Sequence, residues 1–144
     1  MAWKSVYWED VQEGQELPTV TMDITCTTVI SGAIASRDFT PVHHDRDFVQ
    51  NLGLKDIFLN NATICGYVGK YITDWTGPEG ELKEISFRIA TPCFPGDTMT
   101  KTGKVIKKYT EGDQHLVDVE YDFAVPQGRN CGGTGTVALP TRGH

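Results

Sequence analysis

A carboxylate and an imidazole, Asp38 and His43, stand five positions apart in the stretch DFTPVH. Pro41 between them disfavours a continuous helix and pushes Thr40 toward an extended conformation, so a loop is predicted here. Such a loop can turn the two side chains toward one point. An imidazole and a carboxylate that face each other can hold one water molecule and move its protons, so the stretch predicts general acid–base chemistry.

The neighbouring polar residues are expected to do other work. His43, His44 and Asp45 form no metal site in this interpretation, because no further spaced cluster of ligands accompanies them. His44 is expected to point elsewhere in a structural role. Asp45 and Asp47 are more typical of helix caps than of catalysts.

The elements around this loop can be predicted from hydrophobic spacing. Residues 19–28 (TVTMDITCTT) alternate with period two and predict a strand, with Val20, Met22, Ile24 and Cys26 on one face. Residues 30–36 predict a short helix. Residues 47–52 predict another, which is capped by Asp45 or Asp47 and ended by Gly53.

One longer helix is predicted over residues 62–75, after the capping residues Asn60 and Asn61. Small residues on a second face of this helix imply that another element wraps it closely. Gly77 and Pro78 end it. The apolar face consists of Ile64, Val68, Tyr71, Ile72 and Trp75.

The rest of the chain is strand-like, over residues 81–92, 97–108, 115–125 and 131–139, with turn signals between the segments. Such spacing favours consecutive antiparallel strands. Segregated helix and strands indicate an α+β domain. We therefore expect a single domain over 1–144, with about five antiparallel strands curled around one central helix, which is the hot-dog fold.

Composition excludes several classes of protein. The chain has 144 residues and a formal net charge of −6, which argues against nucleic-acid binding and requires any anionic ligand to be met locally. The opening residues contain no apolar signal segment and no apolar run is long enough to span a membrane, so a cytoplasmic protein is expected. The four scattered cysteines predict buried thiols in a reducing compartment, not disulfides or a zinc site.

Three motifs in chain order carry a family resemblance: residues 8–18 (WEDVQEGQELP), 35–45 (ASRDFTPVHHD) and 92–98 (PCFPGDT). They resemble the MaoC-like, R-specific enoyl-CoA hydratases (hydratase 2), and the likeness extends over about residues 7–139. It implies that Asp38 and His43 act as the acid and base in the hydration of a 2-enoyl-CoA to a (3R)-3-hydroxyacyl-CoA. No cofactor is implied, because CoA is part of the substrate.

The resemblance also suggests substrate-binding residues. The family stabilises the thioester oxygen with a backbone N–H at a His-Gly pair that opens the central helix, and this pair falls on Asn60 and Asn61. The sequence departs from the family pattern there, and again at Arg37 and Thr40. A separate basic stretch could be a solvated strand face or could meet the phosphates of CoA, chiefly through its last two residues; it consists of Lys101, Lys104, Lys107 and Lys108.

A narrower likeness is to the small MaoC-like subunits of actinobacterial steroid side-chain hydratases. It rests on residues 35–38, 43–47, 55–58 and 73–78. It implies a steroid enoyl-CoA substrate and pairing with a second hot-dog chain, which could be a MaoC-like hetero-partner or a copy of this chain. A sheet with free edges favours pairing on physical grounds as well.

Two other functions remain open at this stage. A non-catalytic hot-dog subunit that binds CoA or shapes a partner's pocket would be expected to lack Asp38 or His43, and both are present. A hot-dog acyl-CoA thioesterase usually carries a carboxylate within the central helix, and residues 62–73 contain none.

Overall fold

The computed structural model describes residues 3–143, so the ends of the expected domain 1–144 lie outside the described residues. Five strands form one antiparallel sheet in the order β1-β3-β4-β5-β2. The strands are β1 (Glu16–Asp23), β2 (Glu81–Ile89), β3 (Thr98–Glu111), β4 (Gln114–Val125) and β5 (Gly128–Ala138). The helical segments are η1 (Trp8–Asp10), α1 (Cys26–Ala35), η2 (Pro41–His43), α2 (Arg46–Asn51) and α3 (Asn61–Thr76).

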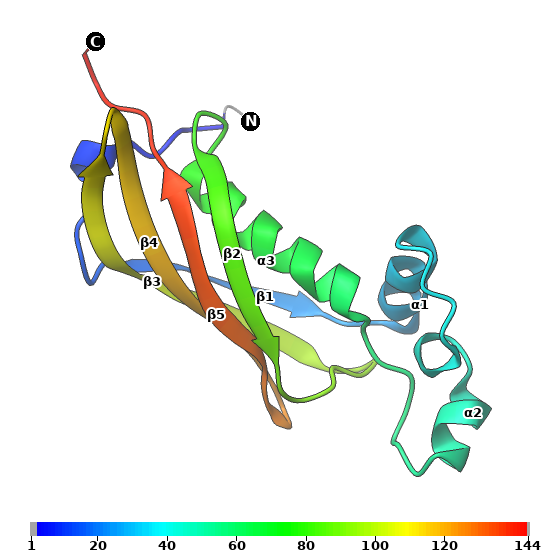
Figure 1. Cartoon of the computed structure of the whole chain (residues 1–144). Helices are drawn as coiled ribbons and strands as arrows, with labels where there is room; N and C mark the ends of the chain where they lie inside the picture. The colour runs from blue at the N-terminus through cyan, green and yellow to red at the C-terminus, as the bar shows by residue number, and fades with distance from the viewer. Residues whose placement is uncertain (1–2, 144) are drawn as a thin grey trace.

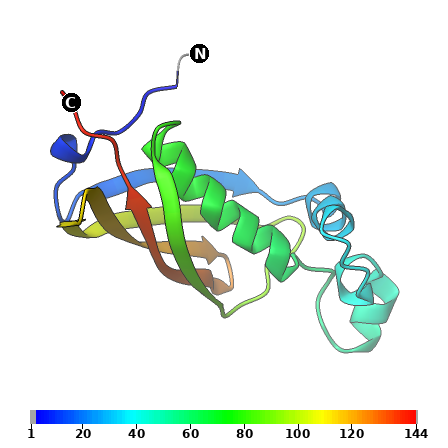
Figure 2. The same ribbon diagram turned by 45° about the horizontal axis from the view of Figure 1, so that its top comes forward.

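The curved sheet wraps around α3, which confirms the predicted hot-dog arrangement (Figures 1 and 2). The helix begins where the side chain of Asn60 accepts a hydrogen bond from the Thr63 N–H, and it ends at Gly77, whose φ of 76° suits glycine. Its buried residues are Ile64, Val68, Tyr71, Ile72 and Thr76.

The strand order corrects one expectation. Consecutive pairing holds for β3, β4 and β5, but β2 pairs with β5 and does not pair with β3. The connection between β2 and β3 contains Pro92 and Pro95, which cannot form a tight hairpin ladder. It crosses to the other side of the sheet, which leaves β1 and β2 as the two edge strands.

The boundary between the first strand and the first helix was predicted wrongly. Strand β1 ends at Asp23, and Cys26 already begins α1. Thr25 caps this helix: its hydroxyl accepts from the Thr28 N–H at 3.1 Å, and the Thr28 hydroxyl accepts from the Thr25 N–H at 3.4 Å. A reciprocal capping pair of this kind overrides the β preference of the threonine-rich run.

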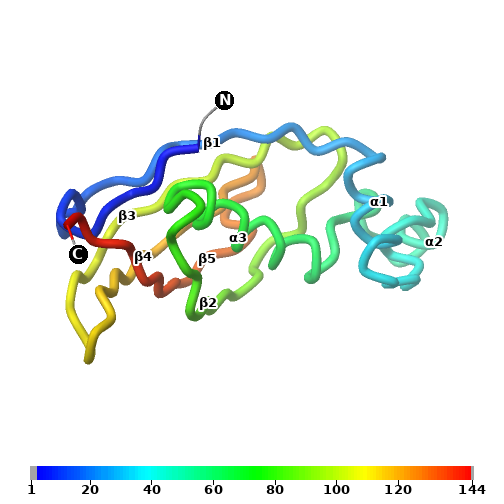
Figure 3. The backbone as a smooth tube through the Cα atoms, turned by 90° about the horizontal axis from the view of Figure 1, so that it is seen from above, coloured from blue at the N-terminus to red at the C-terminus, as the bar shows by residue number. Residues whose placement is uncertain are grey.

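The segment formed by α1, η2 and α2 projects beyond one end of the sheet, close to the start of α3 (Figures 1 and 3). Helix α2 is capped by the Asp45 side chain and is followed by Gly53 at a φ of 82°, as predicted. We call residues 26–59 the helical lobe. This lobe carries both candidate catalytic residues.

All four cysteines are free thiols, and Cys93 and Cys131 are buried as expected. Cys26 is exposed, because it lies in the first turn of α1 instead of on the inner face of a strand. Among the described residues, no helix combines the length and the hydropathy that crossing a membrane requires.

Candidate active site

The loop after α1 is directed by an unusual backbone conformation. Arg37 has a φ of 56°, in the left-handed region, and the Asp38 N–H donates to the carbonyl of Ala33 at 2.9 Å. Glycine adopts this conformation without steric cost, whereas arginine does not. The reversal turns Asp38 back toward the first turn of α3.

His43 is fixed in one orientation by its Nδ1 atom. Pro41 opens the short helix η2, and the ring of His43 places Nδ1 2.7 Å from the carbonyl oxygen of Phe58. A carbonyl only accepts, so Nδ1 carries the hydrogen and Nε2 of the neutral ring keeps its lone pair. The Phe58 ring also packs edge-on against the imidazole, with 5.1 Å between the centroids.

The free Nε2 of His43 faces the carboxylate of Asp38, with 3.4 Å between Nε2 and Oδ2. Both atoms are acceptors when the ring is neutral, so a proton donor such as water can bridge them. The side chains are 10% and 31% exposed, respectively, which leaves the pair reachable from solvent but partly shielded. The sequence-predicted pair therefore meets at one point.

Three donors hold Asp38 as a carboxylate. The Thr40 hydroxyl donates to Oδ1 at 2.7 Å and the Thr40 N–H at 3.2 Å, while the Asn60 amide donates to Oδ2 at 3.1 Å. The Thr40 hydroxyl, then the Asn60 amide and the Thr40 N–H, lower the pKa of this carboxyl below its ordinary value. Asp38 is consequently ionised at neutral pH.

Asn60 has a role that sequence reasoning missed. Its Oδ1 caps α3, and its Nδ2 donates to Asp38 and, at 2.8 Å, to the Ser36 hydroxyl. The residue is 1% exposed. The sequence predicted Asn60 as a helix cap and, through the family resemblance, as a substrate-binding residue, which stays a prediction. The contact with Asp38 was not predicted, because it joins positions 22 residues apart.

Asn61 is the first residue of α3, and its side chain is exposed. Backbone N–H groups in the first turn of a helix lack an intrahelical acceptor and favour negative charge. Asn61 directly follows Asn60, so this N–H lies in the turn that adjoins the pair of Asp38 and His43. Its use as an oxyanion donor stays a prediction.

The structure does not bring the two candidate phosphate-binding lysines to this site. Lys107 and Lys108 lie near the far end of β3, at the opposite end of the sheet from the helical lobe (Figures 1 and 3). The Lys108 ammonium donates to the Val11 carbonyl at 2.9 Å and stacks on Trp8, whereas Lys107 is exposed beside Tyr109. Their binding of CoA phosphates stays a prediction.

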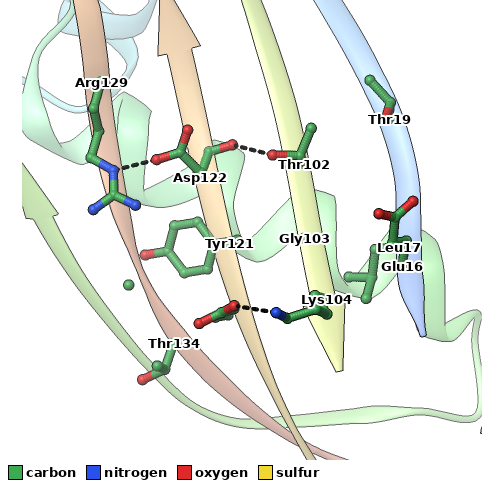
Figure 4. Close-up of a pocket in the computed structure, with 12 residues that line it drawn as sticks. Glu16, Leu17, Thr19, Thr102, Gly103, Lys104, Tyr121, Asp122, Arg129 and Thr134 are labelled. Atoms are coloured by element: carbon green, nitrogen blue, oxygen red, sulfur yellow. Dashed lines mark hydrogen bonds and ion pairs between the residues drawn. The ribbon is translucent and has the colours of Figure 1, made fainter. Parts of the chain in front are cut away.

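Two surface hollows differ in whether their lining residues contact this site. Figure 4 shows one of about 500 Å³ on the face of the sheet turned away from α3, where Lys104 pairs with Glu120 at 3.2 Å. No predicted site residue lines it. A groove of about 580 Å³ between α1 and α3 instead includes Ser36 and Thr63, which both hydrogen bond to Asn60.

Comparison with known proteins identifies the family of this chain. The MaoC like domain model matches residues 10–125. The chain belongs to the MaoC-like family. It is 39% identical over 119 residues to the 3-oxo-4,17-pregnadiene-20-carboxyl-CoA hydratase beta subunit of Mycobacterium tuberculosis, a match that covers 74% of this chain and 92% of that protein.

Solved structures support the same family and fold. The ChsH1-ChsH2 complex from Mycobacterium tuberculosis contains a chain 35% identical to this MaoC-like chain, with a TM-score of 0.82 over 89% of this chain and 98% of that one. The (R)-hydratase from A. caviae is 19% identical, with a TM-score of 0.80 over 92% and 99% of the two chains, and it bears on the fold alone.

Proposed function

We propose that this MaoC-like chain is the catalytic subunit of an enoyl-CoA hydratase. The observation that carries the proposal is the meeting of the free Nε2 of His43 and the ionised carboxylate of Asp38 at 3.4 Å. A subunit that only shaped a partner's pocket would have no need for this pair, or for the amide of Asn60 that holds the carboxylate.

The proposed step adds one water molecule across the double bond of a 2-enoyl thioester. Asp38 and His43 hold the water, and Nε2 takes one of its protons while the oxygen forms a bond to C3. The π electron pair moves onto C2 and the thioester oxygen, where the Asn61 N–H would stabilise the charge. Return of the proton to C2 gives the (3R)-3-hydroxyacyl-CoA and restores His43.

The substrate class follows from the relatives. The Mycobacterium tuberculosis relative is named as a hydratase subunit for a 3-oxo-pregnadiene carboxyl-CoA, and a similar chain forms the ChsH1-ChsH2 complex. We extend this to a steroid side-chain enoyl-CoA as substrate and to a second hot-dog chain as partner. A thioesterase is disfavoured, because the carboxylate of Asp74, near the end of α3, is paired with Lys70 at 2.6 Å.

The experiment mixes the full chain, alone and with a candidate partner chain, with a short and a steroid 2-enoyl-CoA. We expect the enoyl absorbance to fall and the hydroxyacyl-CoA to form without release of free CoA. Release of the CoA thiol would indicate a thioesterase. Binding of enoyl-CoA with no turnover in any pairing would indicate a non-catalytic subunit.

A further inference from the structure

A separate cavity of about 370 Å³ lies between β1 and α3. We call it the β1–α3 pocket. Its wall is largely apolar and includes Val20 and Met22 from the edge strand and Tyr71 and Trp75 from the helix. Pockets for small molecules occupy about 300–1,000 Å³ and combine apolar walls with a few polar groups, so this pocket has the usual size and lining.

One polar group of the β1–α3 pocket is Lys101, which is only 5% exposed. Its ammonium lies 4.6 Å from the ring centroid of Tyr67 and 5.3 Å from that of Phe123. Its one hydrogen-bond acceptor within the described part of the chain is the weak sulfur of Met22, at 3.9 Å. The nearby Asp74 carboxylate bonds instead to Lys70.

A buried ammonium without an oxygen acceptor is costly unless a ligand or another charge compensates it. The aromatic faces of Tyr67 and Phe123 offset part of this cost, because cation–π contacts stabilise a desolvated cation. Burial lowers the pKa of the Lys101 ammonium, Lys70 lowers it further, and Asp74 acts in the opposite direction. Two or three N–H donors of Lys101 remain available to an incoming oxygen.

The groove between α1 and α3 runs along α3 from the residues beside Asn60 toward this pocket, and the two share Lys70. It begins at Ser36 and Thr63 beside Asn60 and continues to Tyr67 and Lys70. Lys70 also lines the β1–α3 pocket, and the Tyr67 ring touches the Lys101 ammonium. The helix advances 1.5 Å per residue, so the distance along α3 from its first turn to Tyr71 is roughly 14 Å.

We infer that the β1–α3 pocket receives the far end of the substrate's acyl group, and that Lys101 donates a hydrogen bond to a ketone oxygen there. The inference deepens the proposed function and rests on it for the position of the thioester at the start of α3. A rigid, apolar acyl group with an oxo group opposite its thioester fits this length and chemistry. The name of the Mycobacterium tuberculosis relative describes such a molecule, with a 3-oxo group and a 20-carboxyl-CoA.

The test uses a steroid that lacks CoA, so that it does not depend on turnover. Progesterone, a 4-ene-3-one, is titrated into the full chain while tryptophan fluorescence is followed, since Trp75 lines the pocket. The matching steroid without the 3-oxygen is titrated in parallel. The variants are Lys101→Met and a control on the same strand, Lys104→Met, whose ammonium pairs with Glu120 on the outer face. Thermal unfolding verifies that each variant is folded.

We expect Lys101→Met to weaken progesterone binding roughly 10-fold, as expected for loss of one hydrogen bond from a charged donor, while Lys104→Met binds like the wild type. Removal of the 3-oxygen should cause the same loss in the wild type and no further loss in Lys101→Met. Absence of binding to the wild type, or equal binding by folded Lys101→Met, would overturn the inference. So would weaker assembly with a second hot-dog chain while progesterone binding is unchanged, because Lys101 would then serve a partner's carboxylate.

The hydratase assay is run separately on the same preparations. Lys101-dependent progesterone binding without hydration of any enoyl-CoA would remove the proposed function and leave a ketone-binding pocket. Hydration of enoyl-CoA without Lys101-dependent progesterone binding would remove the inference about the pocket and leave the proposed function.

Discussion

His43 and His44 are adjacent in the chain, yet only one of them is placed for chemistry. His43 is buried, and its ring is held between Phe58 and Asp38. His44 is exposed and forms the C-cap of η2. The chain therefore offers its own matched control for the proposed base.

We expect His43→Ala and Asp38→Asn to lower kcat for enoyl-CoA hydration by about 10²–10⁴-fold, because each removes one half of the proton-transfer pair. His44→Ala should retain nearly the wild-type rate. Initial rates of enoyl absorbance loss, with circular dichroism to verify folding, provide the measurement. A folded His43→Ala protein with the full rate would refute the assignment.

The ionisation of Asp38 is set chiefly by Thr40. Without the threonine hydroxyl the carboxylate loses the donor that lowers its pKa most, so Thr40→Ala should raise the pKa of Asp38 toward the ordinary value of 3.8. A ¹³C NMR titration of the Asp38 carboxyl measures this shift directly. Thr102→Ala is the control, since the Thr102 hydroxyl donates to the Asp122 carbonyl at 3.4 Å.

The sign of the stability effect follows from the lowered pKa. A carboxylate whose pKa falls on folding contributes stability above its unfolded pKa, and this contribution is lost as the pH falls through the folded value. The contribution of Asp38 therefore disappears on the acid side, and it should be smaller in Thr40→Ala. An unchanged pKa in that variant would mean that the Asn60 amide and the backbone N–H of residue 40 are enough to hold the carboxylate.

At the scale of elements, Asn60 joins the stability of α3 to the geometry of the candidate active site. Its Oδ1 caps the helix and its Nδ2 holds Asp38. Asn60→Ser keeps a capping oxygen and loses the amide donor, whereas Asn60→Ala loses both. Asn60→Ala should be less stable than Asn60→Ser by about 1 kcal/mol, the usual worth of a cap.

Both variants should hydrate enoyl-CoA more slowly than the wild type by a similar factor, because both lack the donor to Asp38. Denaturant unfolding and kcat are measured on the same samples. If activity followed stability across the two variants, Asn60 would act on the site only through the helix.

Elements were predictable where one local rule dominated. The apolar spacing and the caps of α3 placed this helix almost to the residue, and the pair of Asp38 and His43 was singled out by the family resemblance together with residue type and spacing. The start of α1 was not predicted correctly. Alternation in a run rich in threonine suits a strand, whereas the reciprocal hydrogen bonds of Thr25 and Thr28 favour a helix. The contact between Asn60 and Asp38 depends on how the lobe folds against α3, which no local pattern records.

At the scale of the whole molecule, the net charge and the sheet edges both point to a partner. The chain carries −6, and its two candidate phosphate-binding lysines lie near the far end of β3, at the opposite end of the sheet from the candidate pair Asp38 and His43. Of the two edge strands, β1 contains Pro18 and a register shift between Leu17 and Val20, which are devices that protect an edge. Strand β2 also has a register shift, between Leu82 and Glu84, but it has no proline, and Phe87 on it is 37% exposed.

We therefore expect assembly through β2, either with a second copy or with another hot-dog chain. Phe87→Lys should shift the species in sedimentation and native mass spectrometry toward the single chain of 15.9 kDa, because lysine on an edge opposes strand pairing. The matched control is Ile106→Lys, which changes an equally exposed residue on the interior strand β3. Assembly that survives Phe87→Lys but fails with Ile106→Lys would place the interface on the sheet face and not at its edge.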